Sequence, residues 1–206
     1  MRVLIVDDHP IVTSGLRALL AGDPEIVIVE ASDAESGERT FMTEQPDICI
    51  LDINLPSVSG FELARRILSH AASARIIMFS MNDDPIFAVR AIEAGAKGYV
   101  SKSGDPWDLV EAIREVGKGG TYLPSTIARN IAFAGPSFAQ SPLAKLTSRE
   151  IEILHLLSKG KSLSEIAWQV HVSYKTIANT SSLMRQKLGV RTSAELVRLA
   201  IANGLS

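Results

Sequence analysis

A short apolar run that ends in a carboxylate, residues 48–52, most constrains how this chain can fold. The run reads Ile-Cys-Ile-Leu-Asp, with Pro46 before it and Pro56 after it. An uninterrupted apolar run of this length predicts a strand buried on both faces, as in a parallel sheet. Open α/β sheets bind ligands at the carboxyl ends of their strands, so Asp52 is a candidate functional residue. An acid after a strand can also simply cap a loop or helix, and for Asp52 alone that alternative is favoured.

The first 118 residues alternate five times between strand-like and helix-like segments. We expect strands at residues 3–6, 26–29, 48–51, 76–79 and 98–100, and helices near residues 10–20, 34–44, 59–69, 84–94 and 106–117. The last helix has a clear start signal, with Asp105 as N-cap and Pro106 at the first helical position. The alternation predicts an α/β domain with a doubly wound, five-stranded parallel sheet of the flavodoxin-like kind.

Charge is divided unevenly along the chain. Residues 1–120 contain 11 Lys and Arg against 19 Asp and Glu, a net charge of −8, whereas residues 145–206 contain nine against four, a net charge of +5. The acidic part favours a metal or phosphoryl site, and the basic part favours a polyanionic partner. The single cysteine, Cys49, suits a core residue in a reducing compartment. With no signal peptide or membrane-spanning run in this sequence, we expect a cytoplasmic protein without a membrane partner.

Polar side chains follow four of the expected strands. Asp7 and Asp8 follow the first, Asp52 the third, Ser80 the fourth and Lys102 the fifth. Clustered carboxylates repel one another unless a cation neutralises them, and an all-oxygen site suits Mg²⁺ or a similar hard ion. A nearby lysine and hydroxyl can hold anionic oxygens, so one carboxylate could act as a nucleophile toward a phosphoryl donor. No G-x-G-x-x-G or Walker A loop follows the first strand, which leaves nucleotide binding of those kinds unsupported.

These segments resemble the receiver domain of bacterial two-component response regulators over roughly residues 1–120. The matching motifs are Val6-Asp7-Asp8-His9, Leu51-Asp52-Ile53, Phe79-Ser80 and Gly98-Tyr99-Val100-Ser101-Lys102. The resemblance implies that Asp52 accepts a phosphoryl group from a sensor histidine kinase. It also implies a Mg²⁺ ion that Asp8 ligates directly, with Asp7 acting through water and Asn54 supplying a main-chain carbonyl oxygen.

The same resemblance implies how phosphorylation would be sensed. Lys102 would pair with the phosphoryl oxygens, and Ser80 and Tyr99 occupy the two switch positions of the family. Phosphorylation would add a charge of about −1.5 to −2 at Asp52. Drawing Ser80 toward that charge would bias a bistable loop, which turns a local event into a signal across the domain.

Residues 121–144 are predicted to join this domain to a second one. A short amphipathic helix is expected from Pro124-Ser125-Thr126 until Gly135-Pro136, with Ile127, Ile131 and Ala134 on one face. Residues 137–144 then have the composition of a linker.

Residues 145–206 are predicted to form a small all-α domain of four helices. We expect them at about 148–159, 163–170, 174–188 and 193–203, with Gly160 and Gly189 closing two of them. Capping boxes begin the first, second and fourth helices, and Ser173 caps the third. The boxes are Thr147 with Glu150, Ser162 with Glu165, and Thr192 with Glu195. The short turn between the second and third helices, together with the basic charge, predicts a helix-turn-helix that binds double-stranded DNA.

The third of these helices is the candidate recognition helix. At 100° per residue, its core face is expected to carry Ile177, Ser181, Met184 and Leu188. The candidate DNA contacts are Lys175, Thr176, Ala178, Asn179, Ser182, Arg185, Gln186 and Lys187. Asn and Gln suit bidentate pairing with adenine, whereas Lys and Arg suit phosphates, as Arg149 and Lys161 nearby would. The alternative is a polar face that is merely solvated.

Four segments of this domain resemble the LuxR-type DNA-binding domain. They are Leu146-Thr147-Ser148-Arg149-Glu150, Glu165-Ile166-Ala167, Lys175-Thr176-Ile177 and Lys187-Leu188-Gly189-Val190. With the receiver, the chain resembles the NarL/FixJ subfamily of response regulators. The family commonly carries Lys where this chain has Ala178, His where it has Thr180, and an apolar residue where it has Ser181. Family behaviour implies a homodimer when phosphorylated, and the candidate contacts on the last helix are Leu196, Leu199 and Ala200.

Three functions follow from these patterns. The favoured one is a transcriptional regulator whose DNA binding is switched by phosphorylation at Asp52, with no enzymatic activity beyond its own phosphoryl transfer and dephosphorylation. The second is a receiver with a weakened DNA-binding helix that acts through a protein partner; Ala178, Thr180 and Ser181, which depart from the family pattern, motivate it. The third is a metal-dependent phosphatase on the acidic site, which the placement of Ser80 and Lys102 disfavours.

Overall fold

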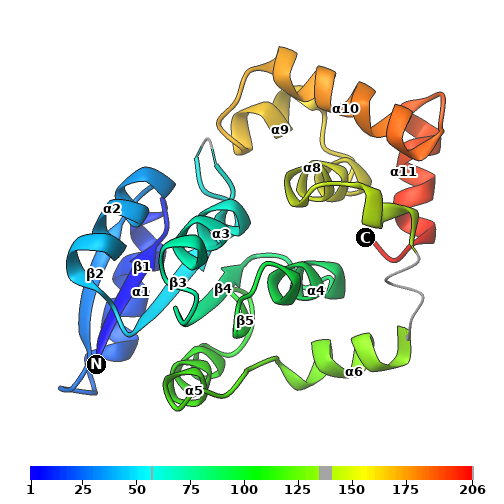
Figure 1. Cartoon of the computed structure of the whole chain (residues 1–206). Helices are drawn as coiled ribbons and strands as arrows, with labels where there is room; N and C mark the ends of the chain where they lie inside the picture. The colour runs from blue at the N-terminus through cyan, green and yellow to red at the C-terminus, as the bar shows by residue number, and fades with distance from the viewer. Residues whose placement is uncertain (57, 135–140, 206) are drawn as a thin grey trace. The chain divides into compact units, whose positions relative to one another are not determined.

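The computed structural model describes residues 1–56, 58–134 and 141–205, which divide into two compact units (Figure 1). The units are Met1–Ala128 and Arg129–Ser206, so the division falls inside helix α6 (Ser125–Ala134). Gly135-Pro136, predicted to end the short helix, and residues 137–140 of the predicted linker lie outside the described residues. The last part of this linker is not extended: the 3₁₀ helix η1 (Pro142–Lys145) begins there, with Ser141 as its N-cap.

The first unit contains the predicted five-stranded parallel sheet. Its strands are β1 (Arg2–Val6), β2 (Val27–Ala31), β3 (Ile48–Asp52), β4 (Ile76–Ser80) and β5 (Gly98–Ser101), in the order β2-β1-β3-β4-β5. The order confirms a doubly wound fold. Its direction reverses between β1 and β3, which is the point where such sheets leave a crevice for ligands. Asp7 follows β1 and Asp52 ends β3, so both acids come from the two strands that flank this point.

Helices cover both faces of this sheet (Figure 1). They are α1 (Pro10–Leu20), α2 (Ala34–Glu44), α3 (Gly60–His70), α4 (Pro85–Glu93) and α5 (Pro106–Gly117), each within one residue of its predicted range. Leu16 of α1 and Ile113 of α5 belong to the core on one face of the sheet. Helices α2 and α3 contact β1 and β3 through the opposite face, where the side chains of Val6 and Leu63 both lie close to Gly37. Asp105 caps α5 by accepting from the Trp107 amide, as predicted.

The middle strands of the sheet are buried throughout, as their unbroken apolar sequence predicts. Every residue of β3 and β4 is buried. Burial raises the pKa of the Cys49 thiol to about 12, so Cys49 is an unreactive core residue.

The chain after α5 returns to the outer edge of β5. The Tyr122 amide donates to the Lys97 carbonyl (2.9 Å), the Tyr122 carbonyl accepts from the Tyr99 amide (3.0 Å), and the Tyr122 hydroxyl donates to Asp108 (2.7 Å). These bonds satisfy backbone groups that an open sheet edge would expose. The sequence pattern assigned Tyr122 to the linker and gave no sign of this attachment.

The second unit contains the four predicted helices among its described residues. They are α8 (Ser148–Ser158), α9 (Leu163–Gln169), α10 (Tyr174–Leu188) and α11 (Ser193–Ala202). All three predicted capping boxes form, and Ser173 caps α10 by accepting from the Thr176 amide. Gly189 closes α10 in the left-handed conformation (φ 69°). In the turn between α9 and α10, His171 is also left-handed (φ 54°).

Gly60 allows α3 to begin directly against the end of β3. Its amide donates to the Ile53 carbonyl (2.9 Å), and a Cβ at this position would lie 2.0 Å from the Asp52 carbonyl oxygen. The obstacle is backbone rather than a flexible side chain. Any side chain at position 60 would therefore displace the strand end that carries Asp52.

Replacing Gly60 with alanine is expected to lower the free energy of unfolding of the first unit by about 2 kcal/mol or more, because the backbone must move. Urea unfolding of the first unit can be followed through the fluorescence of Trp107. Trp168, the other tryptophan of the chain, lies in the second unit and is replaced by phenylalanine so that it does not contribute to the signal. Gly15→Ala is the matched control: nothing lies within 4 Å of its added Cβ. Because alanine favours the helical conformation more than glycine does, Gly15→Ala in α1 should raise the free energy of unfolding by about 0.5–1 kcal/mol. Equal effects of the two substitutions would contradict the steric argument.

Candidate functional site

The ammonium group of Lys102 joins two buried carboxylates at the carboxyl end of the sheet. Its Nζ lies 2.7 Å from Asp7 Oδ2 and 2.8 Å from Asp52 Oδ2, and the three side chains are only 5 %, 1 % and 2 % exposed. The position of Lys102 is fixed by its own amide, which donates to the Ser80 carbonyl (2.7 Å). The aromatic ring of Phe79 lies 5.5 Å from the same ammonium group. Three of the predicted site residues are thus in direct contact.

Two further predicted residues complete the acidic cluster. Asp8 lies beside Asp7, and the Asn54 amide donates to Asp52 Oδ1 (3.1 Å). His9, which the sequence pattern did not single out, also belongs here: its Nδ1 lies 2.8 Å from Asp8 Oδ1. Ligand atoms of Asp7, Asp8, His9 and Asp52 all lie within 4.8 Å of one another. The acidic site is therefore compatible with a bound Mg²⁺ ion, as its carboxylate chemistry predicts.

Burial is the main influence on the charge of Asp52. It raises the pKa of this carboxyl, and the negative charge of Asp7 acts in the same direction, while Lys102 opposes both. The net pKa is still raised. Ionisation of Asp52 is therefore disfavoured at this site unless a further cation is present.

The two predicted switch residues are linked through a residue that the sequence did not reveal, Asn82. The Ser80 hydroxyl accepts hydrogen bonds from the Asn82 amide (3.1 Å) and from its side chain Nδ2 (3.3 Å). The Tyr99 hydroxyl donates to the Asn82 carbonyl (2.5 Å). All three residues are buried, and burial raises the pKa of Tyr99, so the phenol is neutral. Asn82 carries no motif signal, because its role depends on the loop conformation alone.

A second set of hydrogen bonds connects the loops that follow β4 and β5. The Ser103 hydroxyl donates to Asp83 (3.0 Å) and shares a hydrogen bond with the Ser101 hydroxyl (2.8 Å). These hydrogen bonds therefore help to fix the position of Lys102 relative to Ser80.

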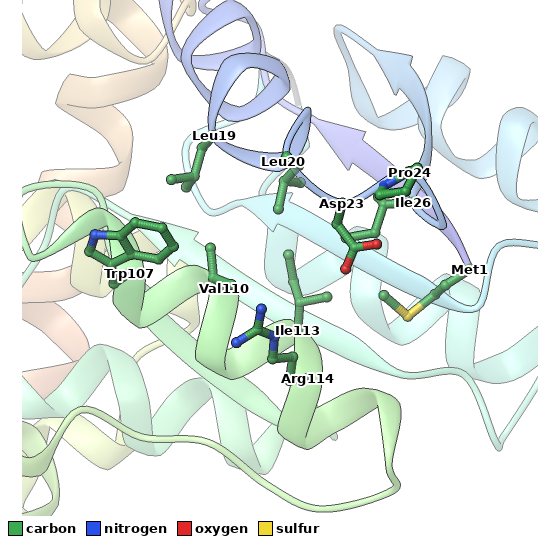
Figure 2. Close-up of a pocket in the computed structure, with 11 residues that line it drawn as sticks. Met1, Leu19, Leu20, Asp23, Pro24, Ile26, Trp107, Val110, Ile113 and Arg114 are labelled. Atoms are coloured by element: carbon green, nitrogen blue, oxygen red, sulfur yellow. The ribbon is translucent and has the colours of Figure 1, made fainter.

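An apolar hollow elsewhere on this unit lacks comparable chemistry. It has a volume of about 300 Å³ and lies between α1, the loop before β2, and α5 (Figure 2). Leu19, Val110 and Ile113 line it, and its two charged side chains, Asp23 and Arg114, have opposite signs. The acidic cluster is therefore the candidate site for phosphoryl chemistry.

Removing the charge of Asp52 is expected to stabilise the first unit at neutral pH. Because the pKa is raised in the folded state, ionising Asp52 destabilises folding, fully so above the raised pKa and not at all well below the ordinary value of 3.8. Without divalent cations, Asp52→Asn should unfold at higher urea concentration than the wild type at about pH 7, and the difference should shrink toward about pH 4. An Asp52→Asn protein that is less stable than the wild type at neutral pH would contradict this account.

In the second unit, α10 presents the predicted faces. Ile177, Ser181 and Met184 are buried, which confirms the helix phasing. The candidate DNA contacts lie away from this core: Lys175, Thr176, Asn179, Gln186 and Lys187 are exposed, and Ala178, Ser182 and Arg185 are half-buried. Leu183, also exposed, adds an apolar group to the polar surface.

Two basic side chains expected at phosphates have partners within the unit. Lys187 Nζ lies 2.8 Å from both carboxylate oxygens of Glu150. Burial alone would raise the pKa of Glu150, but hydrogen bonds from Lys187 and Thr147 hold the pKa of this carboxyl below its ordinary value, so Glu150 is ionised beside Lys187. Arg149 donates to Glu152 (2.7 Å) and to the Val170 carbonyl (2.8 Å). Among the described residues, Lys175 has no such acidic partner and is the more available cation.

The expected dimer contacts on α11 are wrong for two of the three residues. Leu196 and Ala200 are fully buried in the core of their own unit, because α11 packs against α8. Leu199 is half-buried, and Ile201 is a large apolar residue of this helix that is exposed. The sequence pattern could identify the apolar face of the helix but not whether it meets α8 or a second chain.

Comparison with known proteins identifies both units. A model of the response regulator receiver domain matches residues 3–114, and a model of the bacterial regulatory proteins of the luxR family matches residues 144–200. Response regulator UvrY of Escherichia coli (strain K12) is 35% identical over 208 residues, covering 100% of this chain and 95% of that protein. None of the described helices is long and apolar enough to cross a membrane.

The chain is also similar to solved structures of response regulators. A LuxR-family two-component response regulator from Aurantimonas sp. SI85-9A1 is 42% identical and covers 64% of this chain and 95% of that one, with a TM-score of 0.62. RcsB from Salmonella enterica serovar Typhimurium, bound to promoter rprA with the phosphomimetic BeF₃⁻, is 28% identical and covers 98% of this chain and 99% of that one, with a TM-score of 0.65. The chain belongs to the NarL/FixJ family of response regulators, with a receiver domain followed by a LuxR-type DNA-binding domain that regulates transcription.

Proposed function

We propose that Asp52 is the phosphoacceptor of this response regulator and that a sensor histidine kinase is the donor. The observation that carries the proposal is the Lys102 ammonium between the carboxylates of Asp7 and Asp52. A cation already in contact with Asp52 can pair with oxygens of an incoming phosphoryl group. Asp52 Oδ would attack the phosphorus atom as the P–N bond to the donor histidine breaks, and the released imidazole takes up a proton. Later hydrolysis at Asp52 would return the protein to its resting state.

The residues of the acidic cluster fit a divalent cation. Asp7, Asp8 and Asp52 bring three carboxylates together, and Lys102 supplies one positive charge to them. We propose that these acids and the main-chain carbonyl of Asn54 hold Mg²⁺. When bound, the ion would neutralise charge on the phosphoryl oxygens. Lys102 would then turn from its carboxylate partners toward the same oxygens.

Ser80 and Tyr99 would report phosphorylation through Asn82. A phosphoryl group on Asp52 adds negative charge close to the Ser80 hydroxyl. If Ser80 turns to donate to it, the hydrogen bonds that Ser80 accepts from Asn82 are broken, and the loop that holds the Tyr99 hydroxyl is released. Tyr99 lies on β5, the strand to which Tyr122 is bonded, so the change has a route along the backbone toward α6.

We further propose the output of this switch. Residues 1–120 would act as the receiver, 121–144 as the connection and 145–206 as the DNA-binding domain, which would pair as a homodimer after phosphorylation. Asn179, Ser182 and Gln186 would contact base edges, and Lys175 and Arg185 phosphates. Thr176, Ala178 and Lys187 would complete the surface. Because its partner is chromosomal DNA, the protein would act in the cytoplasm.

Phosphorylation at Asp52 can be tested with a small donor. With acetyl phosphate and Mg²⁺, the intact wild-type protein should gain the mass of one phosphoryl group, and Asp52→Ala should gain none, because the attacking oxygen is absent. Asp47→Ala is the matched control, since Asp47 is an exposed acid immediately before the same strand. Asp47→Ala should gain the same mass as the wild type. A modification that persists in Asp52→Ala would refute the assignment.

The basic residues of the recognition helix should differ in their effect on salt dependence. Lys175→Ala is expected to reduce the slope of log K against log salt concentration by about 1, the contribution of one phosphate contact. Lys187→Ala should reduce it less, because Glu150 already neutralises that charge. The measurement is fluorescence anisotropy of a labelled duplex over a range of salt concentrations.

The control for both variants is Arg198→Ala, which removes an exposed cation from α11. It should leave the slope unchanged, because α11 is not the recognition helix. A larger loss of slope for Lys187→Ala than for Lys175→Ala would mean that the Glu150 pair opens on DNA.

A further inference from the structure

We propose that His9 is a nitrogen ligand of the cation in the receiver, and that it makes the site prefer Mn²⁺ and heavier first-row divalent cations to Mg²⁺. The inference rests on the proposed function, because it concerns the same acidic site. It goes beyond that function by adding an imidazole to an oxygen-only ligand set. His9 would therefore determine which metal loads the receiver.

The position of the imidazole fits a shared ion. His9 Nδ1 lies 2.8 Å from Asp8 Oδ1 and 3.3 Å from Asp7 Oδ1. Two adjacent ligands of an octahedral ion, each about 2.1 Å from the metal, lie about 3.0 Å apart. The two observed separations lie on either side of this value. An ion could thus bind His9 Nδ1 and Asp8 Oδ1 together, with Asp7 Oδ1 close enough to act directly or through water.

The backbone holds His9 at this position. Its amide donates to Asp7 Oδ1 (2.9 Å), and it is the N-cap residue of α1 with Pro10 next in the chain. The His9 side chain makes no capping hydrogen bond to α1. The ring is therefore free of any helix-capping role, and its replacement should not weaken the start of the helix.

The remaining atoms of the cluster leave room for this ligand. Lys102 contacts the Oδ2 atoms of Asp7 and Asp52, whereas His9 faces the Oδ1 atoms of Asp7 and Asp8. The ammonium group and the imidazole thus occupy different sides of the carboxylate cluster. The His9 side chain is 60 % exposed and Asp8 is 13 % exposed, so this side is open to an incoming ion.

The chemistry of the ligands predicts that the site prefers Mn²⁺ to Mg²⁺. Mg²⁺ binds oxygen ligands and keeps several waters. Imidazole nitrogen suits transition metals, and affinity for a mixed site rises from Mn²⁺ toward Cu²⁺. Mn²⁺ is the appropriate probe, because it tolerates the same octahedral carboxylate site and carries unpaired electrons. The competing explanation is that the ring only pairs with the carboxylates as a charged neighbour, without binding metal.

The experiment uses the full-length protein with Mn²⁺ as the ligand, at about pH 8, where free imidazole is neutral. Pulsed electron paramagnetic resonance should show ¹⁴N coupling from an imidazole in the wild type and none in His9→Ala. The control is His70→Ala, because His70 is a partly exposed histidine of the same unit that pairs with Glu38 (2.9 Å) instead. It should keep the coupling. Competition between Mn²⁺ and Mg²⁺ should show the Mn²⁺ preference reduced about tenfold or more in His9→Ala.

The outcomes separate this inference from the proposed function. Mn²⁺ that binds, is lost in Asp8→Ala and shows no ¹⁴N coupling would overturn the role of His9 while leaving the acidic metal site intact. Mn²⁺ binding that is unchanged in Asp8→Ala would overturn the metal site itself, and the inference with it. An unchanged Mn²⁺ preference in His9→Ala would also overturn the inference.

Discussion

The ion pairs of Lys102 with Asp7 and Asp52 are the interaction on which the receiver site depends. Two almost fully buried carboxylates repel each other strongly in a low-dielectric environment, and the shared ammonium group is what allows them to lie together. The sheet order brings this about, because β1 and β3 are neighbours at the point where the strand order reverses. The pKa of Asp52 nevertheless stays raised. A further cation would therefore favour the ionised form of Asp52.

The two ends of the site are connected to different parts of the receiver. On one side, His9 and Asp8 open toward solvent at the start of α1, where an ion can enter. On the other side, Ser80, Asn82 and Tyr99 form a buried chain of hydrogen bonds that ends on β5. The solvent side of the site thus holds the groups proposed to bind an ion, and its interior holds the groups proposed to report phosphorylation.

Most of the fold could be predicted because it depends on local signals. The apolar run of β3 required a buried strand, and the S/T-x-x-E boxes located the helix starts of the second unit. Helical spacing also gave the core face of α10, including the buried Ser181. The rim acids could be expected together, because parallel strands end at the same edge. Family resemblance supplied the roles expected of Asp52 and Lys102.

The parts that were not predicted depend on long-range or loop contacts. Nothing in the periodicity shows that Tyr122 returns to the edge of β5, or that Glu150 pairs with Lys187 across 37 residues. Asn82 acquires its position from the loop alone. Leu196 has the same apolar character whether it faces α8 or another chain, so the expected dimer contact was wrong. Residue chemistry alone could not reveal these contacts, because each depends on segments that are distant in the sequence or on the conformation of a loop.

The most direct test of the account measures DNA selection by the purified full-length protein. Fragmented genomic DNA would be bound with and without acetyl phosphate and Mg²⁺, by the wild type and by Asp52→Asn, and the recovered fragments sequenced. The account predicts selective enrichment that rises with the phosphodonor in the wild type only. Enrichment that is equal with and without the donor, or absent although Asp52 is phosphorylated, would contradict control of DNA binding by this site.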